Sequence, residues 1–296
     1  MDERLAAQMD VAGLSDEEFV TRAFLTLLRR PPDAQSKAEA IDSLRRNTLS
    51  RAGLLADLAA SDEFWRLRAL DDAASRAAAA HAGRESPHEL TAPVDVDERP
   101  IEIAWTLGRY RGERRVLDLG YAFAEPIWLS ALVAAHPHEL TGVDLVEREV
   151  PGMQSVVADL RSLPFANRSF DVVFCISTVE HVGADNTRYG ADAEADPNGP
   201  LDALRELRRV VTRGGRILLS VPSGTSPEET WYVQHAADEW RELFRQADLY
   251  VYDDEEYART TDGWRAGAAG DERVLCAELH PGRLRHELVR RLRRSK

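Results

Sequence analysis

The chain has few of the features that mark membrane-spanning, secreted and nucleic-acid-binding proteins. No apolar run approaches the roughly 20 residues that a helix needs to cross a bilayer. The first ten residues are polar and acidic and lack the apolar core of a secretory signal. The formal net charge of -13 repels phosphate backbones. We therefore expect a cytoplasmic protein without a nucleic-acid partner.

Cysteine is scarce as well. The two cysteines, Cys175 and Cys276, both lie in apolar, strand-like runs. This placement favours two buried thiols in a reducing compartment over a disulfide or a metal site.

Glycine is missing where a nucleotide-binding loop would need it. The stretch VLDLGYAFAEP has the outline of a strand, a loop and the start of a helix, but it lacks the G-x-G-x-x-G pattern that lets a backbone approach a pyrophosphate. Gly120 is followed by Ala122 and Ala124, and Glu125 adds a negative charge at the first turn. The loop therefore disfavours a phosphate ligand and suits one with a single carboxylate. Asp118 suits a positively charged amino group on that ligand.

The first 70 residues have the pattern of a helical bundle. Ser15 and Glu18 have the spacing of a capping box, and apolar residues recur after them at helical intervals. Helical patterns also cover residues 33–46 and 50–58, and Ser61 is placed to cap a fourth helix. These elements predict a small all-α domain over residues 1–70.

The rest of the chain divides into three parts. Residues 71–100 are rich in alanine, charge and proline with little periodicity, which predicts a partly helical linker. Residues 101–280 alternate short apolar runs with helical stretches, which predicts an α/β domain with a parallel sheet covered on both faces. Residues 281–296 predict a basic amphipathic helix, which either contacts an acidic partner or a membrane surface or packs its leucines on its own domain.

Seven strands are predicted in the α/β domain, and ligands of such sheets bind at the carboxyl ends of the strands. The predicted strands are Arg115–Leu119, Leu140–Val143, Ser155–Ala158, Asp171–Ile176, Arg216–Val221, Leu249–Tyr252 and Arg273–Leu279.

Acidic residues stand at the ends of the first three of these strands. Asp118 lies near the end of the first strand, and Asp144 ends the second, where a carboxylate can accept both ribose hydroxyls. Asp159 follows the third strand, where a carboxylate can accept an adenine amino hydrogen, and the next residue, Leu160, can offer its backbone N–H to the ring. Each acid alone also fits a strand-end cap or a turn former. As a series they favour ligand contact.

Four stretches in order, VLDLGYAFAE, GVDLVE, ADLRSLPFANRSFDVVFCISTVEHV and TRGGRILLSVP, resemble the class I S-adenosylmethionine-dependent methyltransferases. The resemblance covers about residues 101–280. It implies a Rossmann-like seven-stranded sheet in the order 3-2-1-4-5-7-6 with the last strand antiparallel. The chain departs from the family pattern at Ala122 and Ala124, where glycine is usual.

The resemblance also implies a set of cofactor-binding residues for S-adenosylmethionine. Asp118 and Gly120 would line the methionine moiety beside Ala122, Asp144 would bind the ribose beside Leu145, Asp159 and Leu160 would bind the adenine, and Ser177 would lie next to the cofactor at the end of the fourth strand.

His181 is the strongest candidate for a general base. It follows the fourth strand on the side where the methyl group would be delivered, and an imidazole with a pKa near 6.5 can take a hydroxyl proton at neutral pH. The alternative is that Glu180 and His181 start a helix and the histidine only packs or caps.

The acceptor side is less defined. The polar stretch of residues 183–199 has the character of a substrate lid. Its acids, Asp185, Asp192, Glu194 and Asp196, fit no defined cation-binding loop, so we assign no metal site and leave a divalent-metal requirement open. Trp231, Tyr232 and His235 follow the fifth strand and are candidate substrate contacts, although a packed tryptophan is the ordinary alternative.

The N-terminal part carries a second resemblance. The pattern FVTRAFLTLLRRPPDAQ, followed by LSRAGLLADLAASDEF, resembles a small helical domain of unassigned function that occurs in bacterial multidomain proteins with glycan-related enzymes. Arg29 and Arg30 replace the usual Gly-Arg before proline.

These patterns together predict an S-adenosylmethionine-dependent methyltransferase that acts on an oxygen of a small molecule, sugar or glycan. Two other functions compete with it. A nicotinamide-dependent oxidoreductase uses a similar sheet, and a non-catalytic assembly module would use the helical bundle and the basic tail. The missing G-x-G-x-x-G disfavours the first, and the intact acids at Asp118, Asp144 and Asp159 disfavour the second.

Overall fold

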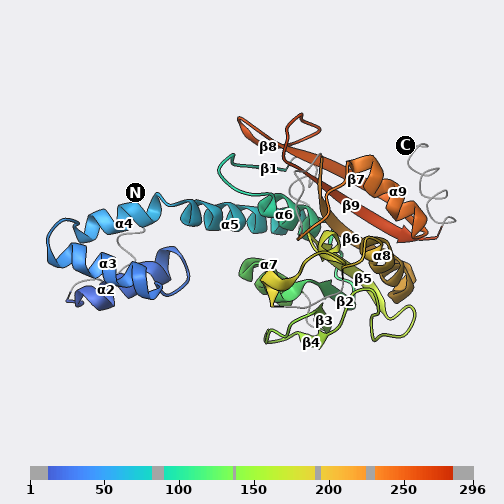
Figure 1. The fold of residues 1–296 in the computed structure, drawn as a ribbon, viewed down its shortest axis with the longest axis horizontal. Coiled ribbons are helices and arrows are strands. Elements are labelled where there is room, and N and C mark those ends of the chain that lie inside the picture. Colours follow the sequence, from blue (N-terminus) through green and yellow to red (C-terminus); the bar gives the residue numbers. More distant parts are fainter. Residues whose placement is uncertain (1–12, 82–89, 136–137, 191–194, 225–230, 283–296) are drawn as a thin grey trace. The chain divides into compact units, whose positions relative to one another are not determined.

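The computed structural model describes residues 13–81, 90–135, 138–190, 195–224 and 231–282. The chain divides into two compact units (Figure 1). The first comprises Met1–Asp71 and Asp95–Asp97, and the second comprises Asp72–Val94 and Glu98–Lys296. No helix in the described ranges is long and apolar enough to cross a membrane.

The first unit is helical, as the sequence predicts. It contains α2 (Asp16–Leu27), α3 (Ala34–Arg45), α4 (Arg51–Ala59) and the first half of α5 (Asp62–His81). The capping box is confirmed, because the Glu18 carboxylate accepts the backbone N–H of Ser15 at 2.9 Å while the Ser15 hydroxyl accepts the N–H of Glu18. Buried apolar side chains of α2, α3 and α4, with Phe64 of α5, form its core.

The second unit is built on one mixed sheet of nine strands. These are β1 (Thr91–Ala92), β2 (Arg115–Leu119), β3 (Glu139–Asp144), β4 (Gln154–Val157), β5 (Phe170–Ile176), β6 (Val211–Ser223), β7 (Leu249–Thr260), β8 (Gly263–Ala266) and β9 (Arg273–Pro281). Their order is β1-β8-β7-β9-β6-β5-β2-β3-β4.

All seven predicted strands are present, and they follow the predicted order. Strands β4, β3, β2, β5 and β6 are parallel neighbours, and β9 lies between β6 and β7 and runs antiparallel to both. The count of seven is wrong, because β8 and β1 extend the sheet beyond β7. Strand β1 lies within the segment predicted to be a linker, and α5 continues into that segment as far as His81.

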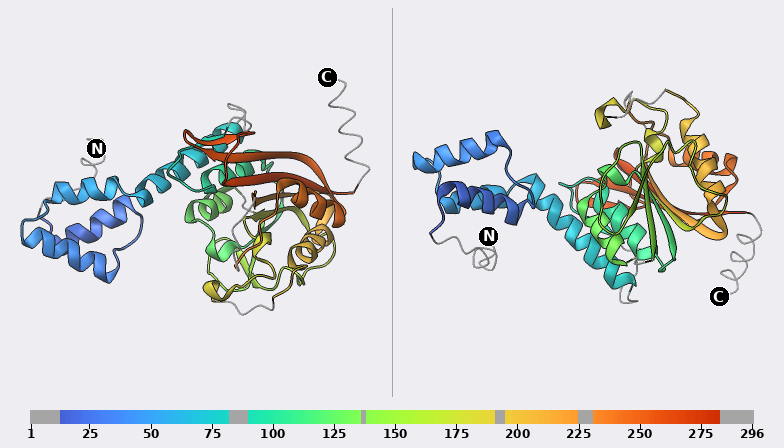
Figure 2. Two further views of the ribbon diagram at one scale, coloured as in Figure 1. Left: turned by 45° about the horizontal axis from the view of Figure 1, so that its top comes forward. Right: turned by 90° about the horizontal axis from the view of Figure 1, so that it is seen from below.

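Helices cover the two faces of the sheet, as Figure 2 shows. The helices of this unit are the second half of α5, α6 (Arg99–Arg109), α7 (Pro126–Ala135), α8 (Gly199–Val210) and α9 (Ala237–Gln246), with short 3₁₀ turns η1 (Tyr121–Phe123), η2 (Val179–His181) and η3 (Thr187–Tyr189). Because side chains alternate across a strand, Cys175 and Leu219 pack in one core with α8 and α9, while Phe174 on the other face contacts Trp128 of α7.

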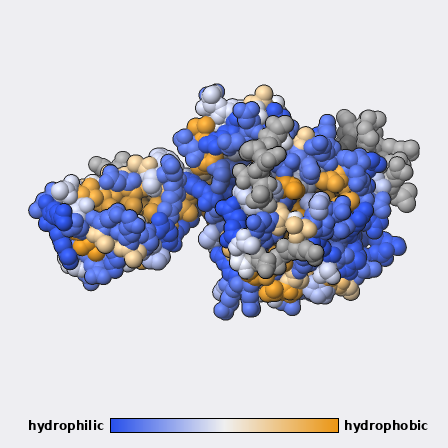
Figure 3. Space-filling view, viewed as in Figure 1, coloured by the Kyte–Doolittle hydropathy of each residue, from blue (hydrophilic) through white to orange (hydrophobic). Residues whose placement is uncertain are grey.

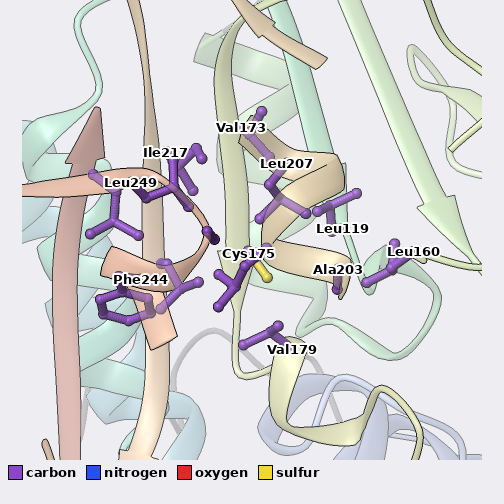
Figure 4. Close-up of a cluster of buried hydrophobic side chains, with 14 of the residues drawn as sticks. Leu119, Leu160, Val173, Cys175, Val179, Ala203, Leu207, Ile217, Phe244 and Leu249 are labelled. Carbon is purple, nitrogen blue, oxygen red and sulfur yellow. The ribbon is translucent and has the colours of Figure 1, made fainter. Parts of the chain in front are cut away.

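One hydrophobic core of this unit lies on the α8 and α9 side of the sheet (Figure 4). There Leu207 of α8 and Phe244 of α9 pack near Val173 and Cys175 of β5. Cys175 and Cys276 are both buried and free, which matches the expectation of two buried thiols. On the visible surface of both units, hydrophobic residues are scattered among hydrophilic ones (Figure 3).

Candidate active site

A pocket lies at the carboxyl ends of the parallel strands β2, β3 and β5. In sheets of this kind ligands bind at that edge. The wall includes every predicted cofactor residue except Ala122, together with His181. The residues brought together in this way are Asp118, Gly120, Asp144, Leu145, Asp159, Leu160, Ser177 and His181.

The loop after β2 needs glycine at one position only. Gly120 has a φ of 76°, and a Cβ atom there would lie 2.4 Å from Oγ1 of Thr178. Ala124 has the ordinary extended values of -66° and 153°. The side chain of Arg148 donates to the carbonyl oxygens of Ala122 and Ala124, both at 3.0 Å, and thereby fixes the loop. The alanines are therefore compatible with this backbone.

Asp118 is an almost fully buried acid on the pocket wall, with 1% of its surface exposed. Its carboxylate accepts a hydrogen bond from Nε1 of Trp128 at 3.0 Å. Burial raises the pKa of Asp118 to about 7; the Trp128 hydrogen bond opposes this rise and the nearby charge of Asp144 adds to it. A cationic group in the pocket would stabilise the ionised form of Asp118.

Asp144 lies at the tip of β3 and is fixed by backbone amides. Its Oδ2 accepts the N–H of Ala122 at 3.0 Å, and its Oδ1 accepts the N–H of Leu145 at 2.7 Å. Burial raises the pKa of Asp144, and these hydrogen bonds act in the opposite direction. Each carboxylate oxygen can accept a second hydrogen bond. Asp144 can therefore still receive two hydroxyl groups, while Ala122 contributes through its backbone.

Asp159 is held differently, by an arginine. Arg161 forms a salt bridge to it, with Nη2 at 2.6 Å from Oδ2, and donates its backbone N–H to Oδ1 at 2.8 Å. Burial acts to raise the pKa of Asp159, but the hydrogen bonds and charge of Arg161 leave it below its ordinary value. Arg161 also lies on the pocket wall, so it is a site residue that sequence reasoning missed.

Ser177 occupies a strained position at the end of β5. Its φ of 40° is in the left-handed region, which costs a non-glycine residue about 1–3 kcal/mol. The Ser177 hydroxyl donates to Oε1 of Glu102 at 2.5 Å, and the Ser220 hydroxyl donates to the same oxygen at 2.8 Å. Glu102 is fully buried in α6, and its Oε2 accepts a hydrogen bond from Nη1 of Arg99 at 2.7 Å.

Glu102 and Arg99 were also missed from the sequence, although Arg99 lies on the pocket wall. A signal was available in the stretch IEIAW, where an acid interrupts an apolar run of α6.

His181 lies on the pocket wall in η2 with a defined hydrogen-bond partner. Its Nδ1 is 2.8 Å from the carbonyl oxygen of Trp231, so Nδ1 carries the proton and donates it to that oxygen. The lone pair is consequently on Nε2. Burial lowers the pKa of His181 to about 4, against the opposing effect of the Trp231 hydrogen bond. The ring is therefore neutral, and able to accept a proton, above about pH 5.

Aromatic rings surround His181. Trp231 stacks on it with centroids 5.1 Å apart, and Tyr189 contacts its edge at 5.5 Å. Tyr189 also packs on Phe123 at 4.9 Å, and both residues line the pocket. Phe123 is 54% exposed, which is high for a large apolar side chain. Sequence reasoning missed this pair.

The three predicted substrate residues do not lie together in the structure. Trp231 and Tyr232 lie close to His181, with Tyr232 at 6.1 Å between ring centroids. His235 instead packs on Trp240 at 4.9 Å and lies 3.8 Å from Glu239. None of the three is part of the pocket wall itself.

The acids of the predicted lid form no metal site in the described ranges. No group of three His, Cys, Asp or Glu residues there is arranged to hold a metal ion. Asp185 accepts from Thr187, and Asp196 lies 3.5 Å from Nη1 of Arg161. Asp192 and Glu194 fall outside the described residues, as does the predicted basic helix from residue 283 onward.

Comparison with known proteins places this pocket in a family. A profile described as a methyltransferase domain matches residues 117–219, which run from β2 to β6 and contain the pocket acids and His181. No curated protein matches the chain.

Several solved structures are similar to part of the chain. A 1,6-didemethyltoxoflavin-N1-methyltransferase of Burkholderia thailandensis, solved with 1,6-didemethyltoxoflavin and S-adenosylhomocysteine, is 19% identical with a TM-score of 0.44 over 71% of this chain and 89% of that one. A protein of Pyrococcus horikoshii is 16% identical with a TM-score of 0.44 over 62% and 90%. A TehB-like methyltransferase of Corynebacterium glutamicum is 17% identical with a TM-score of 0.42 over 61% and 87%. Because these TM-scores are below 0.5, no conclusion rests on them.

The sheet order and the pocket at its carboxyl edge define an α/β cofactor-binding domain. The match over residues 117–219 supports a class I S-adenosylmethionine-dependent methyltransferase domain in the second unit, with S-adenosylmethionine as its methyl donor.

Proposed function

We propose that this methyltransferase transfers the methyl group to a hydroxyl oxygen of a small molecule, and that the acceptor is a sugar or glycan. His181 is the general base in this proposal. The observation that carries it is the fixed neutral imidazole on the wall of the same pocket as the cofactor acids. An oxygen acceptor gains from such a base, because a hydroxyl must lose its proton as it is methylated.

The pocket residues fit the proposed cofactor. Asp118 is buried with only Trp128 donating to its carboxylate among the described hydrogen bonds, which suits an amino group that carries a positive charge. Asp144 retains acceptor capacity for the ribose hydroxyls. When bound, S-adenosylmethionine supplies an electrophilic methyl group on a sulfonium sulfur. Asp118, Asp144 and Asp159 would hold and orient it, and alignment of the acceptor oxygen would contribute most of the rate.

Aromatic surfaces near the base support a ring-shaped acceptor. Phe123 and Tyr189 on the pocket wall offer faces on which the C–H face of a sugar can stack. A planar phenol would use the same faces. The acceptor panel described below distinguishes sugars from phenols. The N-terminal resemblance to domains found with glycan-related enzymes favours the sugar.

The test supplies labelled S-adenosylmethionine with a panel of nucleotide sugars, oligosaccharides and phenols, with and without Mg²⁺. We expect label in a sugar, and we expect His181→Ala to lose about 10²-fold or more in turnover while its affinity for S-adenosylhomocysteine is kept. His235→Ala is the matched control, because that histidine lies outside the pocket wall. Label in phenols only would overturn the sugar acceptor, and normal turnover of His181→Ala would overturn the base.

A further inference from the structure

Glu180, the residue before the candidate base, is a buried acid with no evident structural use for one of its oxygens. It is 2% exposed, and its Oε2 has no hydrogen-bond partner among the described residues. Leaving a buried polar atom unsatisfied costs stability, so such atoms are rare in folded proteins. A glutamate that only packed against the core would lower the stability of the fold with no compensating function. The unsatisfied oxygen therefore points to a role of Glu180 in the site.

The surroundings of Glu180 explain where it acts. Its Oε1 lies 3.9 Å from Nε2 of His181, the nitrogen that carries the lone pair. The other ionisable groups whose charges reach it are Glu98, Arg99 and Glu102 of the α6 region, Cys175 of β5 and Tyr189 of η3. The nearest cation among them, Arg99, already pairs with Glu102 at 2.7 Å. Among the described residues, the ion pair of Glu180 is the one with His181 itself, at 3.9 Å.

We propose that Glu180 is a positioning residue that sets the proton affinity of His181, and that its carboxylate form strengthens the base. This inference rests on the proposed function, because it assigns Glu180 a role through His181. In the transfer step, the acceptor hydroxyl gives its proton to Nε2, and the oxygen uses an electron pair to bond to the methyl carbon. The carbon–sulfur bond breaks with its electron pair left on sulfur. The imidazolium formed is then stabilised by the carboxylate 3.9 Å away.

The pH dependence follows from burial. Burial raises the pKa of Glu180 to about 8, with the charge of Glu102 adding to the rise. His181 has a pKa lowered to about 4, so from about pH 5 to 8 both groups are neutral. Above about pH 8 Glu180 is a carboxylate and His181 is still neutral. The base therefore becomes stronger as the pH rises through about 8.

The first experiment reads His181 directly and needs no acceptor. Nitrogen chemical shifts of the His181 ring, assigned by their loss in His181→Ala, are followed by NMR from pH 6 to 9.5 in the full chain. We expect an inflection near pH 8 that disappears in Glu180→Gln, which is isosteric with the neutral acid. Glu239→Gln, which removes a carboxylate 3.8 Å from His235, is the matched control and should keep the His181 inflection. An inflection that is absent, or that persists in Glu180→Gln, contradicts the proposal.

The second experiment measures single-turnover methyl transfer over the same pH range, with the acceptor found in the panel. We expect the wild-type rate to rise by about threefold or more, since a carboxylate within 4–6 Å raises the pKa of a neighbouring cation by a unit or more and only a fraction of that change appears in the rate of proton transfer. Glu180→Gln should stay at the low-pH rate and keep its affinity for S-adenosylhomocysteine. Equal loss at every pH would indicate a structural role and overturn the proposal.

Two further outcomes are informative. If EDTA or added Mg²⁺ shifts the part of the pH–rate profile that depends on Glu180, then Glu180 and His181 bind a metal and the proposal is wrong. If His181→Ala retains full turnover while the NMR inflection is present, the base assignment fails although Glu180 and His181 remain coupled. The two failures are therefore distinguishable.

Discussion

Acidic side chains differ in pairing and in pKa between the helical unit and the pocket of the methyltransferase unit. In the helical unit, Glu17 and Glu63 pair with Lys37 and Arg30 at 2.7 and 2.6 Å. The hydrogen bond and charge of Lys37 lower the pKa of Glu17. In the pocket region, Asp118 and Glu180 are buried away from such partners, and burial raises their pKa values to about 7 and 8. Acids on the surface of the helical unit support the fold, whereas raised pKa values mark Asp118, Asp144 and Glu180 in the pocket region. Asp159, which pairs with Arg161, is the exception there.

The largest effect is expected for Asp144→Ala. This change removes the acceptor of two ribose hydroxyl hydrogen bonds, each worth roughly 1.5–3 kcal/mol, so affinity for S-adenosylhomocysteine should fall by more than about a hundredfold. Titration calorimetry measures it. Asp171→Asn is the matched control. Asp171 lies near the start of β5, at the end of the strand away from the pocket, and pairs with Arg115. An unchanged dissociation constant in Asp144→Ala would remove Asp144 from the cofactor site.

A smaller effect is expected on the pH dependence of stability. The unfolded chain ionises these acids near pH 4, but the folded protein ionises Asp118 near 7 and Glu180 near 8. The contribution of these two acids to the free energy of unfolding should therefore fall as the pH rises from about 4 to 8 and then level off. Glu180→Gln removes its share of this loss, so at pH 9 it should be more stable than wild type by at least about 1 kcal/mol, or roughly 2–4 °C in Tm. Thermal melts at pH 5 and 9 measure the difference, and a variant less stable than wild type at pH 9 would contradict it.

The smallest effect is expected from deletion of residues 1–71. Every residue of the pocket wall belongs to the second unit, so affinity for S-adenosylhomocysteine should change by less than about threefold. The shortened chain starts at Asp72 because β1 pairs with β8 and the carbonyl of Val94 accepts Nε of Arg259. A folded shortened chain with no affinity would show that the helical unit contributes to the site.

The sequence was sufficient for the elements that are defined locally. Apolar runs with turn signals predicted β2, β3, β4, β5, β6, β7 and β9, and the capping box predicted the start of α2. Strand β1 was missed because it contains only two residues. Strand β8, with the sequence GWRA, was missed because it lacks an apolar run of the kind that marks the equally short β4.

The missing parts of the site depend on tertiary contacts. Glu102 meets Ser177 from a helix 75 residues earlier in the chain, and His181 meets the Trp231 carbonyl from 50 residues away. No spacing rule connects such pairs. His235 was chosen for its position after a strand, whereas the structure turns it toward Trp240 and Glu239. The predicted cofactor acids therefore lie together on the pocket wall, whereas the three predicted acceptor residues lie outside it.

The central claim is that the pocket holds a buried acid that awaits a cationic ligand, and one calorimetric titration tests it most directly. S-adenosylhomocysteine is titrated into wild type and Asp118→Asn between pH 6 and 8, in buffers of different ionisation enthalpy. Because the pKa of Asp118 is about 7 without a ligand, a bound ammonium group that stabilises the carboxylate must displace the Asp118 proton to the buffer. We predict that wild-type affinity rises roughly tenfold from pH 6 to 8 with proton release to the buffer, and that Asp118→Asn shows neither change. Wild-type affinity that is independent of pH, with no proton released, would contradict the account.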